Sequence, residues 1–104
     1  MEYKNITAEE FKKIQEENPD VVVLDVRTPA ELRQGKIPGS ANIDIMDRKF
    51  AEKVEQLDKG KTYLVYCRSG NRSGQACANM AGKDFQDLYN LKGGVNHWPY
   101  KTEL

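Results

Sequence analysis

Residues 61–73 read KTYLVYCRSGNRS, and the rest of the chain is organised around this stretch. Its first half is a run of β-branched and aromatic residues, which predicts a strand buried in the core. Its second half is a short polar loop, and the alanine-rich residues 74–81, GQACANMA, are typical of a helix. Cys67 therefore lies where a buried strand ends and a helix is about to begin.

The position of Cys67 favours a reactive thiolate. Backbone N–H groups of such a loop can form a nest that binds anions, and the positive end of the helix dipole points at the same place. Arg68 and Arg72 add two positive charges close by in the sequence. Each effect favours the ionised form, so we expect the pKa of Cys67 to lie below the value of about 8.5 for free cysteine. A thiolate is nucleophilic, and the same cradle would hold an anionic substrate.

The composition describes a small domain without an overall electrostatic preference. With 104 residues, 38% hydrophobic and 31% charged, the chain can bury one core, so we expect residues 1–104 to form a single domain. Sixteen Lys and Arg balance sixteen Asp and Glu, which argues against nucleic-acid and membrane partners. No apolar run is long enough to predict a transmembrane helix, and residues 1–5, MEYKN, lack the apolar core of a signal peptide. A cytoplasmic location is expected.

The two cysteines are too few for a disulfide scaffold, and their spacing fits no zinc pattern, so no metal site is predicted. Cys77 lies between two alanines in the predicted helix. We interpret it as a small buried hydrophobic residue, because free cysteine is among the most buried residue types. The alternative is a resolving thiol for an oxidised Cys67, which requires that the two side chains meet.

Strands and helices alternate along the rest of the chain. Thr7 and Glu10 form a capping box for a helix that stops at Asn18-Pro19, and Thr28-Pro29 begins a second, short helix that ends at Gly35. The other expected elements are strands at 21–26, 41–43 and 87–91 and helices at 47–57 and 93–98. This alternation predicts an α/β fold with a central, mostly parallel sheet and helices on both faces. The functional crevice of such a sheet lies at the carboxyl ends of its strands, where Cys67 falls.

Three motifs of the chain resemble those of the rhodanese family. Residues 24–43, LDVRTPAELRQGKIPGSANI, are similar to the N-terminal signature of these domains. Residues 67–73, CRSGNRS, resemble their active-site loop, and residues 91–98, LKGGVNHW, resemble their C-terminal signature. The family often has histidine where this chain has Lys36. The resemblance implies a three-layer rhodanese-like domain with a five-stranded, mostly parallel sheet, and sulfurtransferase activity through a cysteine persulfide.

The implied reaction has two steps. A small anionic donor such as thiosulfate would lose a sulfur to the Cys67 thiolate, and a nucleophilic acceptor, cyanide or a thiol, would then take it. Backbone N–H groups would stabilise the charged outer sulfur, and no metal or organic cofactor is expected. We predict Cys67 as the catalytic residue, and Gly70 is expected to allow a left-handed turn. The predicted substrate-binding residues are Arg68, Ser69, Gly70, Asn71, Arg72 and Ser73.

Two other functions would use the same cysteine. Cysteine phosphatases and arsenate reductases also hold a thiolate in an anion cradle, but they place an arginine six residues after the cysteine. Here that position is Ser73 and Arg72 stands at five, so the loop favours attack on sulfur over attack on phosphorus. The second alternative is a relay or regulatory module that passes a persulfide between protein partners, because carrying and transferring sulfur need the same cysteine.

The two arginines of the loop have different expected roles. Arg72 is the best candidate for a substrate ligand, since arginine favours bidentate recognition of anions, and its alternative is a solvated charge beside the helix. Arg68 points out of the loop, where it either recruits the donor or meets water.

Charged and aromatic residues outside the loop are interpreted as structural. Asp25 lies on a buried strand and must be paired. Arg27 and Glu31 could pair with each other across the start of the second helix. Nothing in the sequence places His97, the sole histidine, beside the predicted nucleophile, so a role as general base is not favoured. Trp98 is expected to anchor the last helix to the core.

Overall fold

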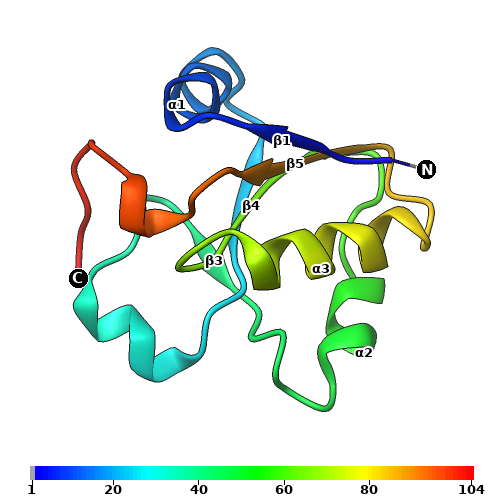
Figure 1. Cartoon of the computed structure of the whole chain (residues 1–104). Coiled ribbons are helices and arrows are strands. Elements are labelled where there is room, and N and C mark those ends of the chain that lie inside the picture. Colours follow the sequence, from blue (N-terminus) through cyan, green and yellow to red (C-terminus); the bar gives the residue numbers. More distant parts are fainter. Residues whose placement is uncertain (1) are drawn as a thin grey trace.

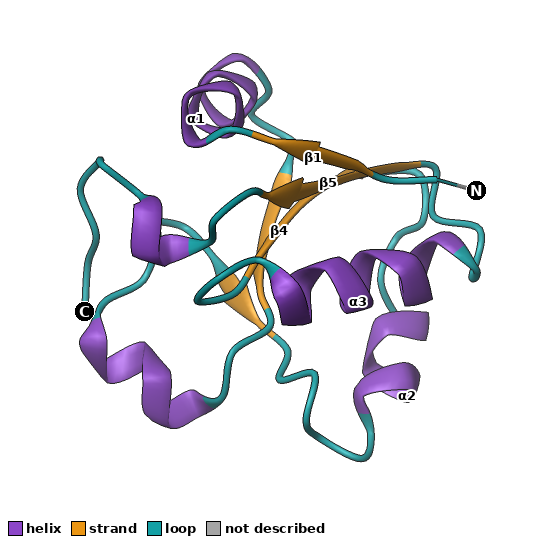
Figure 2. Cartoon of the chain, viewed as in Figure 1, coloured by secondary structure: helices purple, strands orange, loops and turns teal. Residues whose placement is uncertain are grey.

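The computed structural model describes residues 2–104, and a five-stranded sheet runs through its middle (Figure 2). Its strands are β1 (Lys4–Ile6), β2 (Val22–Asp25), β3 (Ala41–Asn42), β4 (Thr62–Tyr66) and β5 (Asp87–Leu91). Their order across the sheet is β1-β5-β4-β2-β3, and every neighbouring pair is parallel. The chain that follows β4 therefore starts from the middle of the carboxyl edge. The predicted α/β class with a parallel sheet is confirmed.

Helices cover both faces of the sheet (Figure 1). The α-helices are α1 (Ala8–Glu17), α2 (Phe50–Glu55) and α3 (Asn71–Ala81), and the 3-10 helices are η1 (Pro29–Gln34) and η2 (Val95–His97). Helix α1 packs on one face, whereas α2 and α3 pack on the other, which gives the expected three layers. Within residues 2–104, no helix combines the length and the apolar character needed to cross a membrane.

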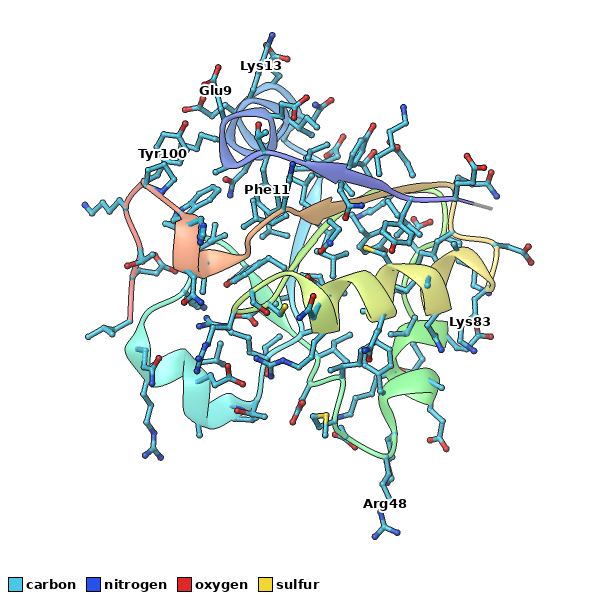
Figure 3. All side chains as sticks on the ribbon, in the orientation of Figure 1. Glu9, Phe11, Lys13, Arg48, Lys83 and Tyr100 are labelled. Atoms are coloured by element: carbon cyan, nitrogen blue, oxygen red, sulfur yellow. The ribbon has the colours of Figure 1, made fainter. Side chains whose placement is uncertain are left out.

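Aromatic side chains close the α1 face of the sheet. Phe11 points from α1 into the interior, whereas Glu9 and Lys13 of the same helix are exposed (Figure 3). Phe11 meets the ring of Trp98 edge to face, with ring centroids 5.4 Å apart. Tyr66 of β4 belongs to the same buried cluster. Trp98 therefore anchors the segment after η2 to the core, as expected.

The opposite face is closed by α2 and α3. Cys77 and Met80 of α3 are fully buried there, against a cluster that includes Val65 of β4. Adjacent residues of β2 serve different faces, because Val23 packs on the α1 side and Leu24 on the α3 side. The uninterrupted apolar run in this strand is thus confirmed as a strand buried on both faces.

Both predicted helix starts are confirmed. The Thr7 hydroxyl accepts the N–H of Glu10 at 3.2 Å, and the Glu10 carboxylate accepts the N–H of Thr7 at 2.9 Å. At the second start, the N–H of Thr28 donates to the Glu31 carboxylate at 3.2 Å. This second helix is a six-residue 3-10 helix, and it ends at Gly35, whose φ is +109°.

Several elements differ from the sequence-based prediction; the last helix, for example, is a 3-10 helix at Val95–His97 rather than a helix at 93–98, and β2 and β3 are shorter than predicted. Strand β1 is not predicted, because its three residues are too few to show a period, and it becomes a strand by pairing with β5. Helix α3 begins at Asn71 rather than at residue 74, so Arg72 and Ser73 lie in its first turn instead of a loop. Helix α2 spans residues 50–55 instead of 47–57, because the Asp47 carboxylate accepts the N–H of Lys49 at 2.8 Å and holds a turn before the helix.

Candidate active site

Cys67 directly follows the last residue of β4, and its side chain is buried. Its sulfur lies 3.0 Å from the backbone nitrogen of Gly70, which donates to it, and 3.3 Å from the hydroxyl oxygen of Ser73. Gly70 has a φ of +101°, which turns the loop back so that its N–H faces the sulfur. A Cβ at Gly70 would come within 3.3 Å of Gly93 N and Leu91 O, so the expected left-handed turn at a glycine is confirmed.

Hydrogen bonds lower the pKa of Cys67 below its ordinary value. Burial is the largest single influence and raises the pKa, because it disfavours a charged sulfur. Together, the Ser73 hydroxyl and the backbone N–H groups of Ser73, Gly70 and Ser69 outweigh burial. The predicted direction of the shift and the predicted nest of N–H groups are confirmed. These hydrogen bonds are the leading causes that lower the pKa, and Arg72 also interacts with the charge of Cys67.

The segment after β5 supports the loop from behind. The N–H of Val95 donates to the carbonyl of Cys67 at 2.9 Å, and the N–H of Asn96 donates to the carbonyl of Arg68 at 3.0 Å. Gly94 comes so close that a Cβ there would lie 2.3 Å from the Arg68 oxygen. Because a Cβ cannot be placed at that distance, a glycine at this position is a condition for the observed loop backbone.

Arg72 forms a bidentate ion pair with Glu31. Its Nη1 and Nη2 atoms lie 2.7 Å and 2.8 Å from the two carboxylate oxygens, which joins the first turn of α3 to η1. The two side chains are 28% and 21% exposed. The pair places a negative charge next to the arginine predicted to bind substrate. An anionic donor would therefore have to share the Arg72 guanidinium with Glu31 or displace the Glu31 carboxylate from it.

The fold is expected to lose stability in acid through Glu31. The guanidinium of Arg72 lowers the pKa of Glu31 to about 2, well below its ordinary value of 4.5. Since the folded pKa is the lower one, the stabilisation is complete above about pH 4.5 and is lost as the pH falls towards 2. For a partly exposed pair we expect about 1 kcal/mol of unfolding free energy. Urea unfolding of Glu31→Gln and wild type, at about pH 6 and about pH 3, measures it.

The expected result is that Glu31→Gln is less stable than wild type near neutral pH and that the difference shrinks in acid. Glu16→Gln is a suitable control, because Glu16 is an exposed residue of α1. A difference between wild type and Glu31→Gln that stays the same at both pH values would contradict this assignment.

Asp25 and Arg27 form a buried ion pair where β2 ends. Arg27 Nη2 lies 2.7 Å from Asp25 Oδ2, and the side chains are 2% and 0% exposed. The same nitrogen donates to the carbonyl of Gly35 at 2.9 Å, which ties the end of η1 to β2. The structural interpretation of Asp25 is confirmed. The predicted Arg27–Glu31 side-chain pair is wrong. The Arg27 guanidinium instead binds the buried Asp25 carboxylate, which needs a partner, and the Glu31 carboxylate binds Arg72.

The remaining predicted site residues lie on the outer side of the loop. Arg68, Ser69 and Asn71 are exposed, so they remain candidates for meeting a substrate. His97 is exposed on η2. In the part of the chain that the structure describes, no three His, Cys, Asp or Glu side chains gather as a possible metal site.

Cys77 is fully buried, which confirms its interpretation as a small core residue. Burial, with a smaller contribution from the charge of Cys67, raises the pKa of Cys77 to about 12. The Cys77 sulfur therefore stays a thiol at neutral pH, and this disfavours its alternative role as a resolving nucleophile.

Asn90 of β5 is a site residue that the sequence analysis misses. It is buried, and its Oδ1 atom accepts a hydrogen bond from the Ser73 hydroxyl. Its Nδ2 atom donates to the Gly70 carbonyl at 3.1 Å and to Asn5 Oδ1 at 2.8 Å. The sequence does carry one sign of this role: Asn90 is an amide residue near the end of the predicted strand DLYNL, next to apolar Leu91. A polar side chain that is buried in a strand needs hydrogen-bond partners, so Asn90 could have been expected to bind a neighbouring segment.

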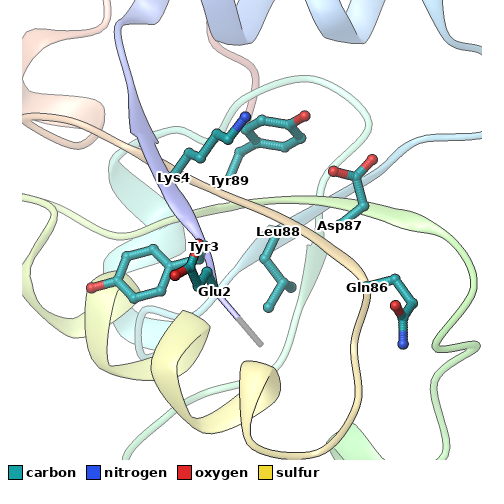
Figure 4. A pocket seen from close by; sticks show the side chains of 7 residues that line it. All are labelled: Glu2, Tyr3, Lys4, Gln86, Asp87, Leu88 and Tyr89. Carbon is teal, nitrogen blue, oxygen red and sulfur yellow. The ribbon is translucent and has the colours of Figure 1, made fainter.

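Surface hollows lie near the edge of the sheet formed by β1. One of about 430 Å³ is lined by residues 2–4 and 86–89, where β1 and β5 begin (Figure 4). Parallel sheets bind ligands at the carboxyl ends of their strands, and this hollow lies at the opposite end of the sheet. Another of about 390 Å³ is lined in part by Gly70, Asn71 and Asn90, so it lies behind the loop of Cys67.

Comparison with known proteins agrees with this geometry. The family model described as Rhodanese-like domain matches residues 7–100. The thiosulfate sulfurtransferase GlpE of Ectopseudomonas mendocina is 30% identical over 97 residues, which cover 93% of this chain and 85% of that protein. A tRNA uridine(34) hydroxylase of Cytophaga hutchinsonii is 39% identical over 95 residues, but these cover 88% of this chain and only 30% of that protein.

A solved structure shares the whole fold. The crystal structure of a rhodanese-related protein from Thermoplasma volcanium matches with a TM-score of 0.84 and 32% identity, over 97% of this chain and 98% of that chain. The family match includes all three motifs, at 24–43, 67–73 and 91–98, and the structure brings the second and third of them together around one cysteine. The chain belongs to the family of rhodanese-like domains.

Proposed function

We propose that this protein is a sulfurtransferase that carries sulfur on Cys67. The observation that supports this most directly is the surrounding of the Cys67 sulfur, with the Gly70 N–H at 3.0 Å and the Ser73 hydroxyl at 3.3 Å. Such donors stabilise a negative charge on the cysteine sulfur. Family membership and the sulfurtransferase name of one relative support the same reaction class.

The first step loads the cysteine. The Cys67 thiolate attacks the outer sulfur of a donor such as thiosulfate, and a new S–S bond forms to Cys67. The S–S bond within thiosulfate breaks, and sulfite leaves with the bonding electron pair. The pKa of Cys67 is lowered by hydrogen bonds, so the nucleophile is available without a separate general base. The persulfide keeps a negative charge on its outer sulfur.

The second step removes the sulfur from Cys67. A nucleophilic acceptor, cyanide or a thiol, attacks the outer sulfur and forms thiocyanate or a new persulfide. The S–S bond to Cys67 breaks, and Cys67 leaves as the thiolate. A cysteine of lowered pKa is the better leaving group, so the same hydrogen bonds assist this step.

We propose that the anionic donor meets the exposed side of the loop first. Arg68 is exposed next to the nucleophile, and no carboxylate within residues 2–104 lies at ion-pair distance from it, whereas Arg72 is paired with Glu31. The backbone groups of Ser69 and Gly70 then face the transferred sulfur. Arg72 contributes to donor binding only if its guanidinium contacts the donor and the Glu31 carboxylate at the same time.

Intact-mass spectrometry tests the proposal. Incubation with thiosulfate should add the mass of one sulfur to the protein, and cyanide should remove that mass and release thiocyanate. Protein without thiosulfate, treated in parallel with cyanide, provides the background. Failure to acquire sulfur from thiosulfate and also from a low-molecular-weight persulfide would overturn the proposal.

A persulfide relay between proteins is the second candidate. The observation that favours it is the similar stretch within a tRNA uridine(34) hydroxylase, where it makes up 30% of a longer chain. A relay should load from a persulfide but saturate poorly with thiosulfate, whereas a free-standing enzyme should turn thiosulfate over at millimolar concentrations. Neither candidate releases phosphate from an aryl phosphate, and such release would instead favour a phosphatase.

A further inference from the structure

The hydroxyl of Ser73 lies between two acceptors. Its oxygen is 3.3 Å from the sulfur of Cys67 on one side and within hydrogen-bond distance of Asn90 Oδ1 on the other. A serine hydroxyl carries one proton, so it can donate fully to only one of them at a time. Ser73 is 0% and Asn90 4% exposed, so both side chains are largely removed from bulk water.

The orientation of the Asn90 amide is determined by its other partners. Nδ2 donates to the carbonyl of Gly70 at 3.1 Å and to Asn5 Oδ1 at 2.8 Å. The Gly70 carbonyl can only accept, so the NH₂ group must face it and Oδ1 must face Ser73. Because Oδ1 cannot donate, the hydrogen bond between Ser73 and Asn90 requires the proton of the serine.

We propose that Asn90 is a positioning residue that competes with Cys67 for the hydroxyl proton of Ser73 and thereby sets how readily Cys67 ionises. When Cys67 is a thiol, Ser73 donates to Asn90 and can accept the S–H of the cysteine. When Cys67 is a thiolate, the hydroxyl turns towards the sulfur, and Asn90 Oδ1 loses its donor. The competition follows from the geometry of the three side chains alone.

The competition also acts on the reaction cycle, and this part of the inference rests on the proposed function. In the persulfide the negative charge lies on the outer sulfur, so the sulfur of Cys67 is a weaker hydrogen-bond acceptor for the Ser73 hydroxyl. The hydroxyl can then return to Asn90. Asn90 therefore favours the loaded persulfide over the free thiolate, and Ser73 turns once in each direction during a cycle.

Other charged or titratable groups lie in the loop of Cys67 and on the elements next to it. They are Arg72 and Cys77 on α3, Arg68 in the loop, Glu31 on η1, and the Asp25–Arg27 pair at the end of β2. Arg72 interacts with the charge of Cys67 but is held by Glu31. All of these groups are retained in the variants below, so a difference between variants reports on Ser73 and Asn90.

The test is a double-mutant cycle on the pKa of Cys67, measured from the pH dependence of alkylation of the Cys67 peptide by iodoacetamide. Asn90→Leu should free the Ser73 proton for the sulfur and raise the acid dissociation constant of Cys67 about three- to tenfold, the range expected for one hydrogen bond. Ser73→Ala should lower that constant about tenfold or more. In the Ser73→Ala background, Asn90→Leu should cause no further change.

Two outcomes would overturn the inference. One is an unchanged pKa in Asn90→Leu, and the other is an equal change with and without Ser73, which would mean that Asn90 acts through Gly70 or through packing. Asn5→Ala is the matched control, since it removes a partner of Nδ2 and leaves Oδ1 facing Ser73. Alkylation needs no sulfur donor, so this result stands apart from success or failure of thiosulfate loading.

A second measurement uses the wild-type protein and does not depend on folding of Asn90→Leu. The side-chain NH₂ signals of Asn90 should shift with the same midpoint as the ionisation of Cys67, because Oδ1 loses its donor at that point. In Ser73→Ala the shift should be largely abolished. NH₂ signals that stay constant through the ionisation of Cys67 in wild type would contradict the competition.

Discussion

Cys67→Ser is expected to lose thiosulfate-dependent sulfur loading completely and to reduce thiocyanate formation by several orders of magnitude, as removal of a covalent nucleophile does. A serine hydroxyl in the same place is not ionised at neutral pH, so the donors of the loop have no anion to stabilise. The substitution is nearly isosteric, and the backbone bond from Val95 to residue 67 does not involve the side chain. Loading is measured by intact mass and turnover by thiocyanate release.

Cys77→Ala is the matched control for this experiment. Cys77 is the other cysteine of the chain, and it is fully buried in the core on the α3 face. Its replacement is expected to cost some stability and to leave loading at one sulfur per chain. Loss of loading in Cys77→Ala with retention in Cys67→Ser would reverse the assignment of the nucleophile.

Arg27→Met is expected to destabilise the fold by about 3 to 5 kcal/mol, because it leaves the Asp25 carboxylate buried without its partner. Asp25 is 0% exposed, and Arg27 approaches it from Nε at 3.0 Å and from Nη2 at 2.7 Å. The loss is a large part of the roughly 5 to 15 kcal/mol that stabilises a typical domain. Urea unfolding monitored by circular dichroism measures it, with Asp25→Asn added to Arg27→Met as the variant in which the charge is removed as well.

Lys53→Met provides a control of matched geometry and different burial. Lys53 Nζ lies 2.7 Å from Asp47 Oδ2, the same distance as in the buried pair, but the two side chains are 50% and 32% exposed. Its loss should cost much less stability than the loss of Arg27, because water solvates the charge that remains. The double variant Asp25→Asn/Arg27→Met should recover part of the lost stability. Equal costs for Arg27→Met and Lys53→Met would contradict the role assigned to burial.

Local sequence patterns were sufficient for the elements that carry strong local signals. The apolar run of β2 and the β-branched run of β4 are strands buried on both faces, and the Thr7–Glu10 capping box begins α1 as predicted. Strand β1 could not be predicted, because its three residues become a strand only through pairing with β5, which lies more than eighty residues along the chain. The sequence pattern predicts a start of α3 that is too late, because Gly70 and Asn71 have weak helix propensity, whereas the helix begins at Asn71 once Gly70 has turned the chain.

The sequence by itself determined the class of fold and the position of Cys67 at the end of a central strand, since both follow from residue order along the chain. Only the tertiary structure decided how the polar side chains around it are paired. Sequence spacing suggested a local Arg27–Glu31 pair, whereas Glu31 binds Arg72, forty-one residues away, and Ser73 binds Asn90, seventeen residues away. The physical reason is that a parallel sheet gathers the carboxyl ends of all its strands at one edge, so that polar groups from distant segments become each other's nearest partners away from water.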